Sequence, residues 1–237
     1  MLLSRTRANL AYRARLALFK IGGVQDALDE SERRVLEAHM GFRGQWEEHR
    51  RFQLEFAKSA GLRPDSSLLE IGCGPLTLGL PAIAYLAANR YTGVDVRPEV
   101  LNLAWSQIGK AGLASKNPRL VHSTSFGAVE LGEARFDFIW SFSVLYHLTD
   151  ALIADWFAQV SRRLAPGGAY FANLNVEQPE STWLQFPFVR RSVDFYRDAA
   201  ARHGLTLREL GTLESLGFRL DSTEKTNLLV RIERAPS

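Results

Sequence analysis

Short apolar runs alternate with helical patterns through the middle of the chain. The apolar runs predict buried strands at 67–71, 91–96, 119–122, 136–141 and 169–175. Apolar residues at helical spacing predict intervening helices at 81–89, 98–112 and 151–164. Strands that alternate with helices in this way are typical of a parallel sheet with helices on both faces.

The pattern changes at both ends of the chain. A predicted helix at 192–203 is followed by two predicted strands, 205–213 and 227–233, with no helix between them. Such a pair predicts an antiparallel hairpin. We therefore expect an α/β domain over residues 61–237, with a doubly wound, mostly parallel sheet of seven strands, and a helical segment or lid over residues 1–60.

The turn after the first predicted strand contains two glycines. Glu70 lies at the end of the strand, Gly72 and Gly74 flank Cys73, and a helix follows. A glycine has no side chain, so a ligand can approach the main-chain N–H groups closely. Asp95 ends the second strand, where an acid can bind ribose hydroxyls. The two features together predict a site for an adenosine-containing ligand, whereas a lone Gly-x-Gly can also be a simple turn.

Residues 70–74, Glu-Ile-Gly-Cys-Gly, with Asp95 in the next strand, resemble the first motifs of the class I S-adenosylmethionine-dependent methyltransferases. Residues 136–150, from Phe-Asp to a helix start that contains a histidine, and 164–168, Leu-Ala-Pro-Gly-Gly, resemble two later motifs of this family. The third glycine of the family is replaced by Leu76. The Gly-x-Gly-x-x-Gly fingerprint of nicotinamide-binding folds requires a glycine at position 77, which is Thr77 here, so the sequence disfavours a dehydrogenase.

The resemblance implies S-adenosylmethionine as cofactor, bound at the carboxyl ends of the strands. The loop after the third strand should contact adenine, but it lacks the family's acid, and Phe126 is a candidate to stack on the purine. The candidate cofactor-binding residues are Glu70, Gly72, Cys73, Gly74, Asp95, Val96, Arg97, Ser123, Thr124, Ser125, Ser141 and Phe142.

His147 follows the fourth strand, where the resemblance implies proximity to the transferred methyl group. It is the candidate base for a substrate hydroxyl or amine, although methyl transfer depends mainly on positioning. The alternative is a histidine that only packs or caps near Asp150. Residues 41–52 contain two glycines, Trp46 and His49, and predict a lid over the site, or simply a helix anchored by its aromatic residues.

An aromatic-rich stretch at 176–191 predicts a wall for the acceptor or, alternatively, a patch for dimerisation. The candidate acceptor-contacting residues are Arg43, Gln45, Trp46, His49, Tyr146, Asn173, Trp183 and Tyr196. We expect no metal site.

The composition of the chain excludes few classes of function. The chain of 237 residues is 46% hydrophobic and 23% charged, with a net charge of +3, so nucleic acid is not an obvious partner. Residues 1–24 hold five basic residues and no acid, which predicts a helix on a membrane surface or a partner, or one whose basic face is solvated. One cysteine and no long apolar run favour a reducing, cytoplasmic setting.

We therefore expect a methyltransferase that acts on a hydroxyl or an amine of a small or medium-sized organic molecule, with oxygen slightly favoured. The tetrapeptide Asn-Pro-Pro-Tyr, used for amino methylation of DNA bases, does not follow the fourth strand. The alternatives are an inactive regulatory protein that binds S-adenosylmethionine, or a related aminopropyl transferase or NAD-dependent reductase.

Overall fold

The computed structural model describes residues 30–40, 45–128, 130–183, 186–220 and 222–236. Helices α2 (Glu30–Met40) and α3 (Trp46–Ser59) precede the first strand. The predicted basic helix at 1–24 and the candidate Arg43 lie outside the described residues. Among the described residues, no helix combines the length and the apolar character that crossing a membrane requires.

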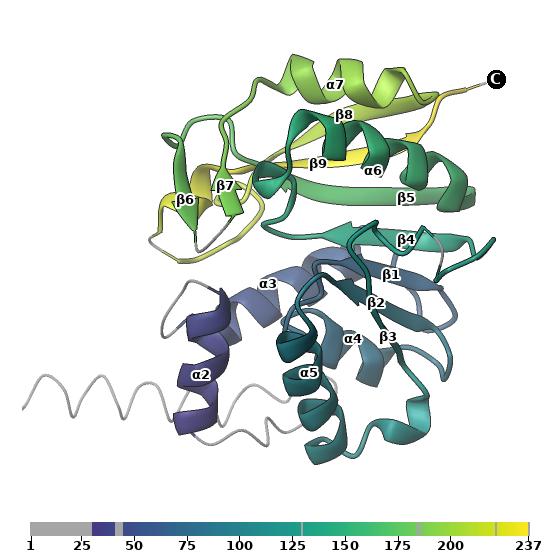
Figure 1. The fold of residues 1–237 in the computed structure, drawn as a ribbon, viewed down its shortest axis with the longest axis vertical. Helices are drawn as coiled ribbons and strands as arrows, with labels where there is room; N and C mark the ends of the chain where they lie inside the picture. Colours follow the sequence, from purple (N-terminus) through teal and green to yellow (C-terminus); the bar gives the residue numbers. More distant parts are fainter. Residues whose placement is uncertain (1–29, 41–44, 129, 184–185, 221, 237) are drawn as a thin grey trace, which may run out of the picture.

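Seven strands form one sheet in the order β3-β2-β1-β4-β5-β9-β8 (Figure 1). Strand β9 runs antiparallel to β5 and β8, and the other neighbouring pairs are parallel, which confirms the predicted mostly parallel sheet with an antiparallel C-terminal pair. The strands are β1 (Leu68–Ile71), β2 (Tyr91–Asp95), β3 (Arg119–His122), β4 (Phe136–Ser141), β5 (Leu164–Leu174), β8 (Leu205–Thr212) and β9 (Leu228–Arg234).

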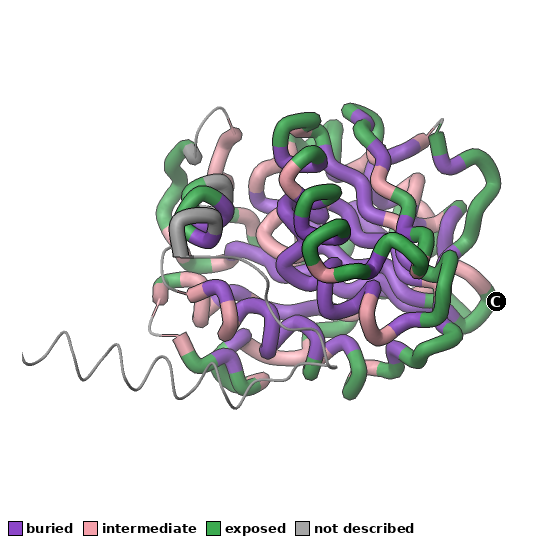
Figure 2. The backbone as a smooth tube through the Cα atoms, turned by 90° about the horizontal axis from the view of Figure 1, so that it is seen from below, coloured by how far each residue is buried: buried purple, intermediate pink, exposed green. Residues whose placement is uncertain are grey.

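Helices cover both faces of this sheet. They are α4 (Gly79–Tyr85), α5 (Pro98–Lys110), α6 (Asp150–Arg163) and α7 (Val193–Ala201). Successive strand residues point to opposite faces, so Leu68 packs in the core under α3, α4 and α5, and Leu69 in the core under α6 and α7. The strands are accordingly buried in the middle of the molecule, with exposed helix surfaces around them (Figure 2). This two-sided burial explains why the strands have continuous apolar sequences.

Three local predictions differ from the structure. Helix α4 ends at Tyr85 rather than at residue 89, because the Ala87 N–H donates to the Pro64 carbonyl at 2.7 Å and so leaves the helical path. Strand β5 begins at Leu164, which pairs with Phe136, so the Pro-Gly-Gly turn lies within an irregular strand. The stretch read as a loop at 176–191 contains a hairpin, β6 (Ser181–Trp183) and β7 (Phe186–Phe188).

Arg163, at the end of α6, holds the connection that follows β3. Its guanidinium donates to the carbonyls of Gly127 and Ala128 at 3.0 and 3.2 Å, and to that of Gly132 at 3.1 Å. The residue is only 3% exposed. The connection that begins with the predicted adenine loop is therefore held by one buried side chain from the end of α6.

We predict that Arg163→Met lowers the free energy of unfolding by about 2 kcal/mol, because several buried carbonyls lose their donor. The neighbouring Arg162 is exposed, and Arg162→Met should change it by less than about 0.5 kcal/mol. Urea unfolding followed by circular dichroism measures both. Equal stabilities of the two variants would contradict a supporting role for Arg163.

Candidate functional site

The turn after β1 is bonded to the end of β2. The N–H groups of Gly72 and Cys73 both donate to the Val94 carbonyl, at 2.8 and 3.1 Å. Gly72 has a φ of +68°, and a Cβ atom there would lie 2.5 Å from Val144 Cγ2. Only glycine satisfies both requirements, because the backbone is left-handed and no space remains for a side chain.

Asp95, at the end of β2, completes this arrangement. Its Oδ2 accepts a hydrogen bond from the Gly74 N–H at 2.9 Å, and its Oδ1 accepts one from the Arg97 N–H at 2.9 Å. The Arg97 guanidinium lies 3.4 Å from the same Oδ1. A carboxylate has about four acceptor positions, so Asp95 can still accept hydroxyl groups from a ligand.

Glu70 lies deeper in the site. The Tyr91 hydroxyl donates to its Oε2 at 2.5 Å. Burial raises the pKa of the Glu70 carboxyl to about 8; the charge of Asp95 adds to this increase and the Tyr91 hydrogen bond opposes it. A cationic ligand group beside Glu70 would lower that pKa again, because an opposite charge favours the carboxylate.

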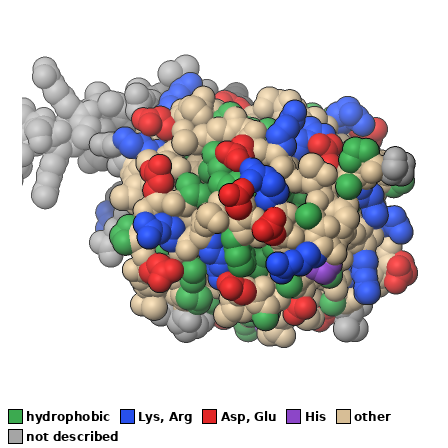
Figure 3. Space-filling model, turned by 90° about the horizontal axis from the view of Figure 1, so that it is seen from above, with side chains coloured by type: hydrophobic (Ala, Val, Ile, Leu, Met, Phe, Trp, Pro, Cys, Tyr) green, Lys and Arg blue, Asp and Glu red, His purple; other side chains and the backbone are tan. Residues whose placement is uncertain are grey.

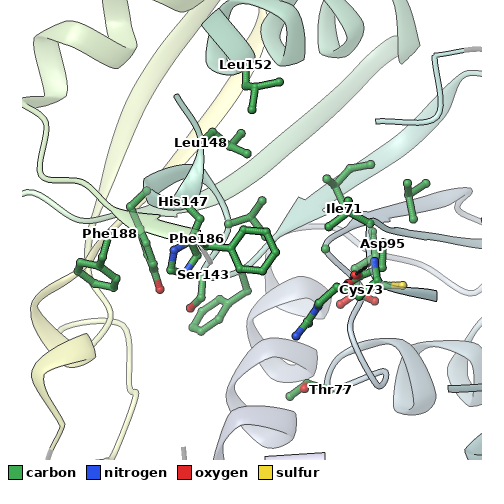
Figure 4. A pocket seen from close by; sticks show the side chains of 18 of the residues that line it. Ile71, Cys73, Thr77, Asp95, Ser143, His147, Leu148, Leu152, Phe186 and Phe188 are labelled. Atoms are coloured by element: carbon green, nitrogen blue, oxygen red, sulfur yellow. Dashed lines mark hydrogen bonds and ion pairs between the residues drawn. The ribbon is translucent and has the colours of Figure 1, made fainter. Parts of the chain in front are cut away.

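These groups line one end of a cavity of about 510 Å³. Figure 4 shows Cys73 and Asp95 on one side, with His147, Phe186 and Phe188 across from them. The predicted residues that line the cavity are Glu70, Gly72, Cys73, Asp95, Val96, Arg97, Ser123, Thr124, Phe142, His49, Tyr146 and His147.

Other predicted contact residues do not line the cavity. The Gly74 N–H donates to Asp95, and Gly74 itself does not form part of the cavity wall. Ser125 lies outside the lining, and its N–H donates to the Ser123 hydroxyl at 3.2 Å. The Ser141 hydroxyl is buried and forms a hydrogen bond of 2.6 Å with the Tyr170 hydroxyl. The Ser125 and Ser141 side chains therefore lie away from the cavity in which we expected them to contact the cofactor.

Several residues predicted to contact the acceptor also do not line the cavity. Trp46 is buried beside Arg50, whose guanidinium lies 4.5 Å from the ring centre, and Gln45 precedes it outside the lining. Tyr196 packs in the core under α6 and α7 because α7 turns it inward. Asn173 is buried, and its Oδ1 accepts a hydrogen bond from the Ser143 N–H at 2.6 Å, which supports the wall from behind. The side chain of Trp183 lies outside the described part of the structure.

His147, in η2 (Leu145–His147), lies on the cavity wall with its tautomer defined. Its Nδ1 is 2.7 Å from the Pro187 carbonyl oxygen. A carbonyl can only accept, so Nδ1 carries the proton and Nε2 is the basic nitrogen of the neutral ring. Burial lowers the pKa of His147 below its ordinary value, despite the Pro187 hydrogen bond. His147 is therefore neutral at physiological pH and able to accept a proton.

Glu224, which sequence analysis missed, lies at the other end of the cavity. It belongs to η3 (Thr223–Thr226), in the connection between β8 and β9. The Ser143 hydroxyl donates to its Oε1, and its Oε2 lies 3.5 Å from His49 Nε2. Burial raises the pKa of Glu224 to about 7 and lowers that of His49 to about 3.

The residues missed from sequence share no local motif. They come from α3, the connections after β1 and β4, the first turn of α6, the chain between β5 and β7, and η3 with the residue that follows it, and only the fold brings them together. They include Gln53, Thr77, Ser143, Val144, Leu148, Leu152, Gln178, Ser181, Thr182, Thr223, Glu224 and Asn227.

Comparison with solved structures shows the same fold in methyltransferases. A protein from Clostridium acetobutylicum described as an S-adenosylmethionine-dependent methyltransferase is 12% identical over 86% of this chain and 97% of its own, with a TM-score of 0.62. The glycopeptide N-methyltransferase MtfA is 17% identical over 80% and 90%, with a TM-score of 0.61. Magnesium protoporphyrin IX methyltransferase from Synechocystis is 12% identical over 88% and 89%, with a TM-score of 0.59.

A family comparison gives independent support from the sequence. Residues 69–170 match the model of a methyltransferase domain. This region runs from β1 into β5 and contains the glycine turn, Asp95 and His147. Residues 69–170 thus match a methyltransferase domain, and the fold around them is the one seen in solved S-adenosylmethionine-dependent methyltransferases.

Proposed function

We propose that this protein transfers the methyl group of S-adenosylmethionine to a hydroxyl or an amine of a small or medium-sized organic molecule. The observation that carries the proposal is one continuous cavity of about 510 Å³, with the glycine turn and Asp95 at one end and aromatic and polar side chains at the other. This volume lies within the range of small-molecule sites. The cavity thus provides room for a donor and an acceptor in contact.

The residues present fit the cofactor part by part. Asp95 retains acceptor capacity for ribose hydroxyls, and Gly72 lines the cavity without a side chain of its own. Glu70 would become ionised beside the ammonium of the methionine portion. Ser123, Thr124 and the Phe126 ring line the part that we assign to adenine.

The sulfonium of the bound cofactor supplies the electrophilic methyl group. The contribution of the chain is then to position the acceptor in line and to exclude water, which accounts for most of the rate increase in such transfers. His147 Nε2 can accept the proton of an acceptor hydroxyl or amine, because its Nδ1 proton is engaged by Pro187.

Several observations support a small-molecule acceptor. Two structural neighbours are described as acting on a glycopeptide and on magnesium protoporphyrin IX. On the face in Figure 3, acidic and basic side chains are interspersed, without the continuous basic surface that suits nucleic acid. We also infer a reducing, cytoplasmic setting, because the single cysteine, Cys73, is built into the cofactor turn.

We further propose that the segment up to residue 60 acts as a lid. Helix α3 supports this, because its residues His49 and Gln53 line the cavity. The preceding basic stretch remains a candidate for contact with a membrane surface or a second copy of the chain.

We predict that Gly72→Ala weakens binding of S-adenosylhomocysteine by more than about 10-fold, because the new Cβ would strain the turn against Val144. Gly109→Ala is the matched control: an added Cβ there meets nothing within 4 Å, and its affinity should match that of the unmodified protein. Isothermal titration calorimetry measures both, with circular dichroism to verify folding.

A second variant keeps the cofactor assignment testable if Gly72→Ala does not fold. Asp95→Asn keeps an acceptor for the Gly74 N–H but removes the negative charge. It should weaken S-adenosylhomocysteine binding by about 10-fold, since hydrogen bonds to charged groups contribute about 1.5–3 kcal/mol. Unchanged affinity in folded Asp95→Asn would refute the assignment of this acid to the ribose.

We predict that His147→Gln lowers kcat by about 10-fold to 100-fold and leaves the affinity for S-adenosylhomocysteine within about 2-fold. His203→Gln, beyond the end of α7, serves as the control. The assay follows methyl transfer from labelled S-adenosylmethionine to acceptors in a small-molecule extract. A wild-type kcat would remove His147 from the chemistry without affecting the cofactor site.

A further inference from the structure

The acceptor end of the cavity contains a carboxylate in a fixed position. Glu224 is 20% exposed and faces the cavity. Its segment is anchored by Gln178, whose Nε2 donates to the Thr223 carbonyl at 2.7 Å and to Asn227 Oδ1 at 2.9 Å. The Asn227 N–H in turn donates to the Glu224 carbonyl at 2.9 Å. The carboxylate therefore has little freedom to leave the cavity.

No cationic side chain balances Glu224 on the part of the wall that the structure describes. Arg97 is the only Lys or Arg among those lining residues, and it pairs with Asp95 at 3.4 Å. Lys225, next to Glu224 in sequence, points to Glu214 at 3.8 Å. His49 lies 3.5 Å from Glu224 but is uncharged at neutral pH, because burial lowers its pKa to about 3.

Aromatic rings surround the rest of this end. Tyr146 packs against Phe188 with ring centres 4.6 Å apart, and His147 lies 5.6 Å from Phe188 and 6.2 Å from Phe186. Tyr146 and Glu224 both line the cavity, and the charge of Glu224 contributes to the raised pKa of Tyr146. Aromatic faces attract cations, as a carboxylate does, so both features favour the same kind of ligand group.

We propose that the acceptor is an amine, and that Glu224 binds its ammonium group at the aromatic end of the cavity and accepts a proton from it before transfer. This inference rests on the proposed function and narrows it to N-methylation. It reverses the slight preference for oxygen that the sequence alone suggested. Glu224 is then a specificity-determining residue as well as a proton acceptor.

The reaction balances with the groups named. An ammonium R–NH₃⁺ gives one proton to the Glu224 carboxylate and becomes R–NH₂. The nitrogen lone pair forms a bond to the methyl carbon, the carbon–sulfur bond breaks, and its electron pair remains on sulfur as the neutral thioether. The product is R–NH₂–CH₃⁺, so the positive charge has moved from sulfur to nitrogen.

Matched amine and alcohol probes test the inference. We would titrate benzylamine with benzyl alcohol, and 2-phenylethylamine with 2-phenylethanol, into the complex of the protein with S-adenosylhomocysteine. For at least one pair, the amine should bind about 10-fold more tightly than the alcohol, since an added charged hydrogen bond contributes about 1.5–3 kcal/mol. In Glu224→Gln this preference should disappear, while S-adenosylhomocysteine affinity stays within about 2-fold.

Glu214→Gln is the control, because Glu214 is an exposed acid in the same β8–β9 connection and does not line the cavity. It should keep the amine preference. Equal binding of amine and alcohol, a preference that survives in Glu224→Gln, or no binding by either amine would overturn the inference. Failure of the unmodified protein to bind S-adenosylhomocysteine would instead refute the proposed function.

The pH dependence provides a second readout. Because burial raises the Glu224 pKa to about 7, its carboxylate forms mainly above that pH, and amine affinity should rise by about 10-fold from pH 6 to pH 8. Of the groups that face Glu224, His49 stays neutral over this range and Tyr146 has a pKa raised well above its ordinary value. Glu70 also lines the cavity, with a pKa of about 8, so the rise should disappear in Glu224→Gln if Glu224 causes it.

Discussion

The site depends on the hydrogen bonds that join the turn after β1 to the end of β2. Two N–H groups of the turn share the Val94 carbonyl, and a third is held by Asp95. These bonds form within the protein alone, so the binding surface is preorganised and its ordering does not reduce ligand affinity. The space left by the missing side chain of Gly72 is occupied by Val144, which precedes the segment with His147. One turn therefore fixes both the donor end of the cavity and the start of its acceptor end.

Helix α3 connects this turn to the distant parts of the site. Arg50 donates to Gln107 at 2.8 Å, and the Gln107 amide donates to the Pro75 carbonyl in the turn. Gln53 accepts from the Trp140 indole at 3.0 Å, and Arg51 donates to the Gly217 carbonyl at 2.9 Å in the connection that leads to Glu224. These buried polar groups explain why α3 is not an ordinary amphipathic helix. Helix α3, which belongs to the segment interpreted as a lid from the sequence, therefore supports the cavity through these hydrogen bonds.

The sequence predicts what local patterns determine. Strand β4 has the predicted bounds, because a parallel strand buried on both faces produces a continuous apolar run. The edge strand β3 also has its predicted bounds, although Val121 is its one buried residue. The glycine turn and Asp95 were found because one short segment and one strand end define them. Glu224, Gln178 and Ser143 could not be found, since each is an ordinary polar residue in a connection and acquires its position only through long-range packing. Tyr196 and Ser141 were assigned to the site because sequence order does not reveal which face of an element is turned inward.

Transfer to a hydroxyl and transfer to an amine differ in where the positive charge of the sulfonium goes. Transfer to a hydroxyl would remove the positive charge from the cavity once the proton has left, whereas transfer to an amine only moves that charge from sulfur to nitrogen. A fixed acid at the acceptor end favours the second course, because its carboxylate binds the ammonium form of the acceptor and then takes up the proton that must leave the nitrogen before transfer. Ser143 donates to this acid, and Asn173 holds the Ser143 main chain from behind. The acceptor end is therefore built around Glu224 from three separate parts of the fold, which is the arrangement expected of a recognition site rather than of a solvated loop.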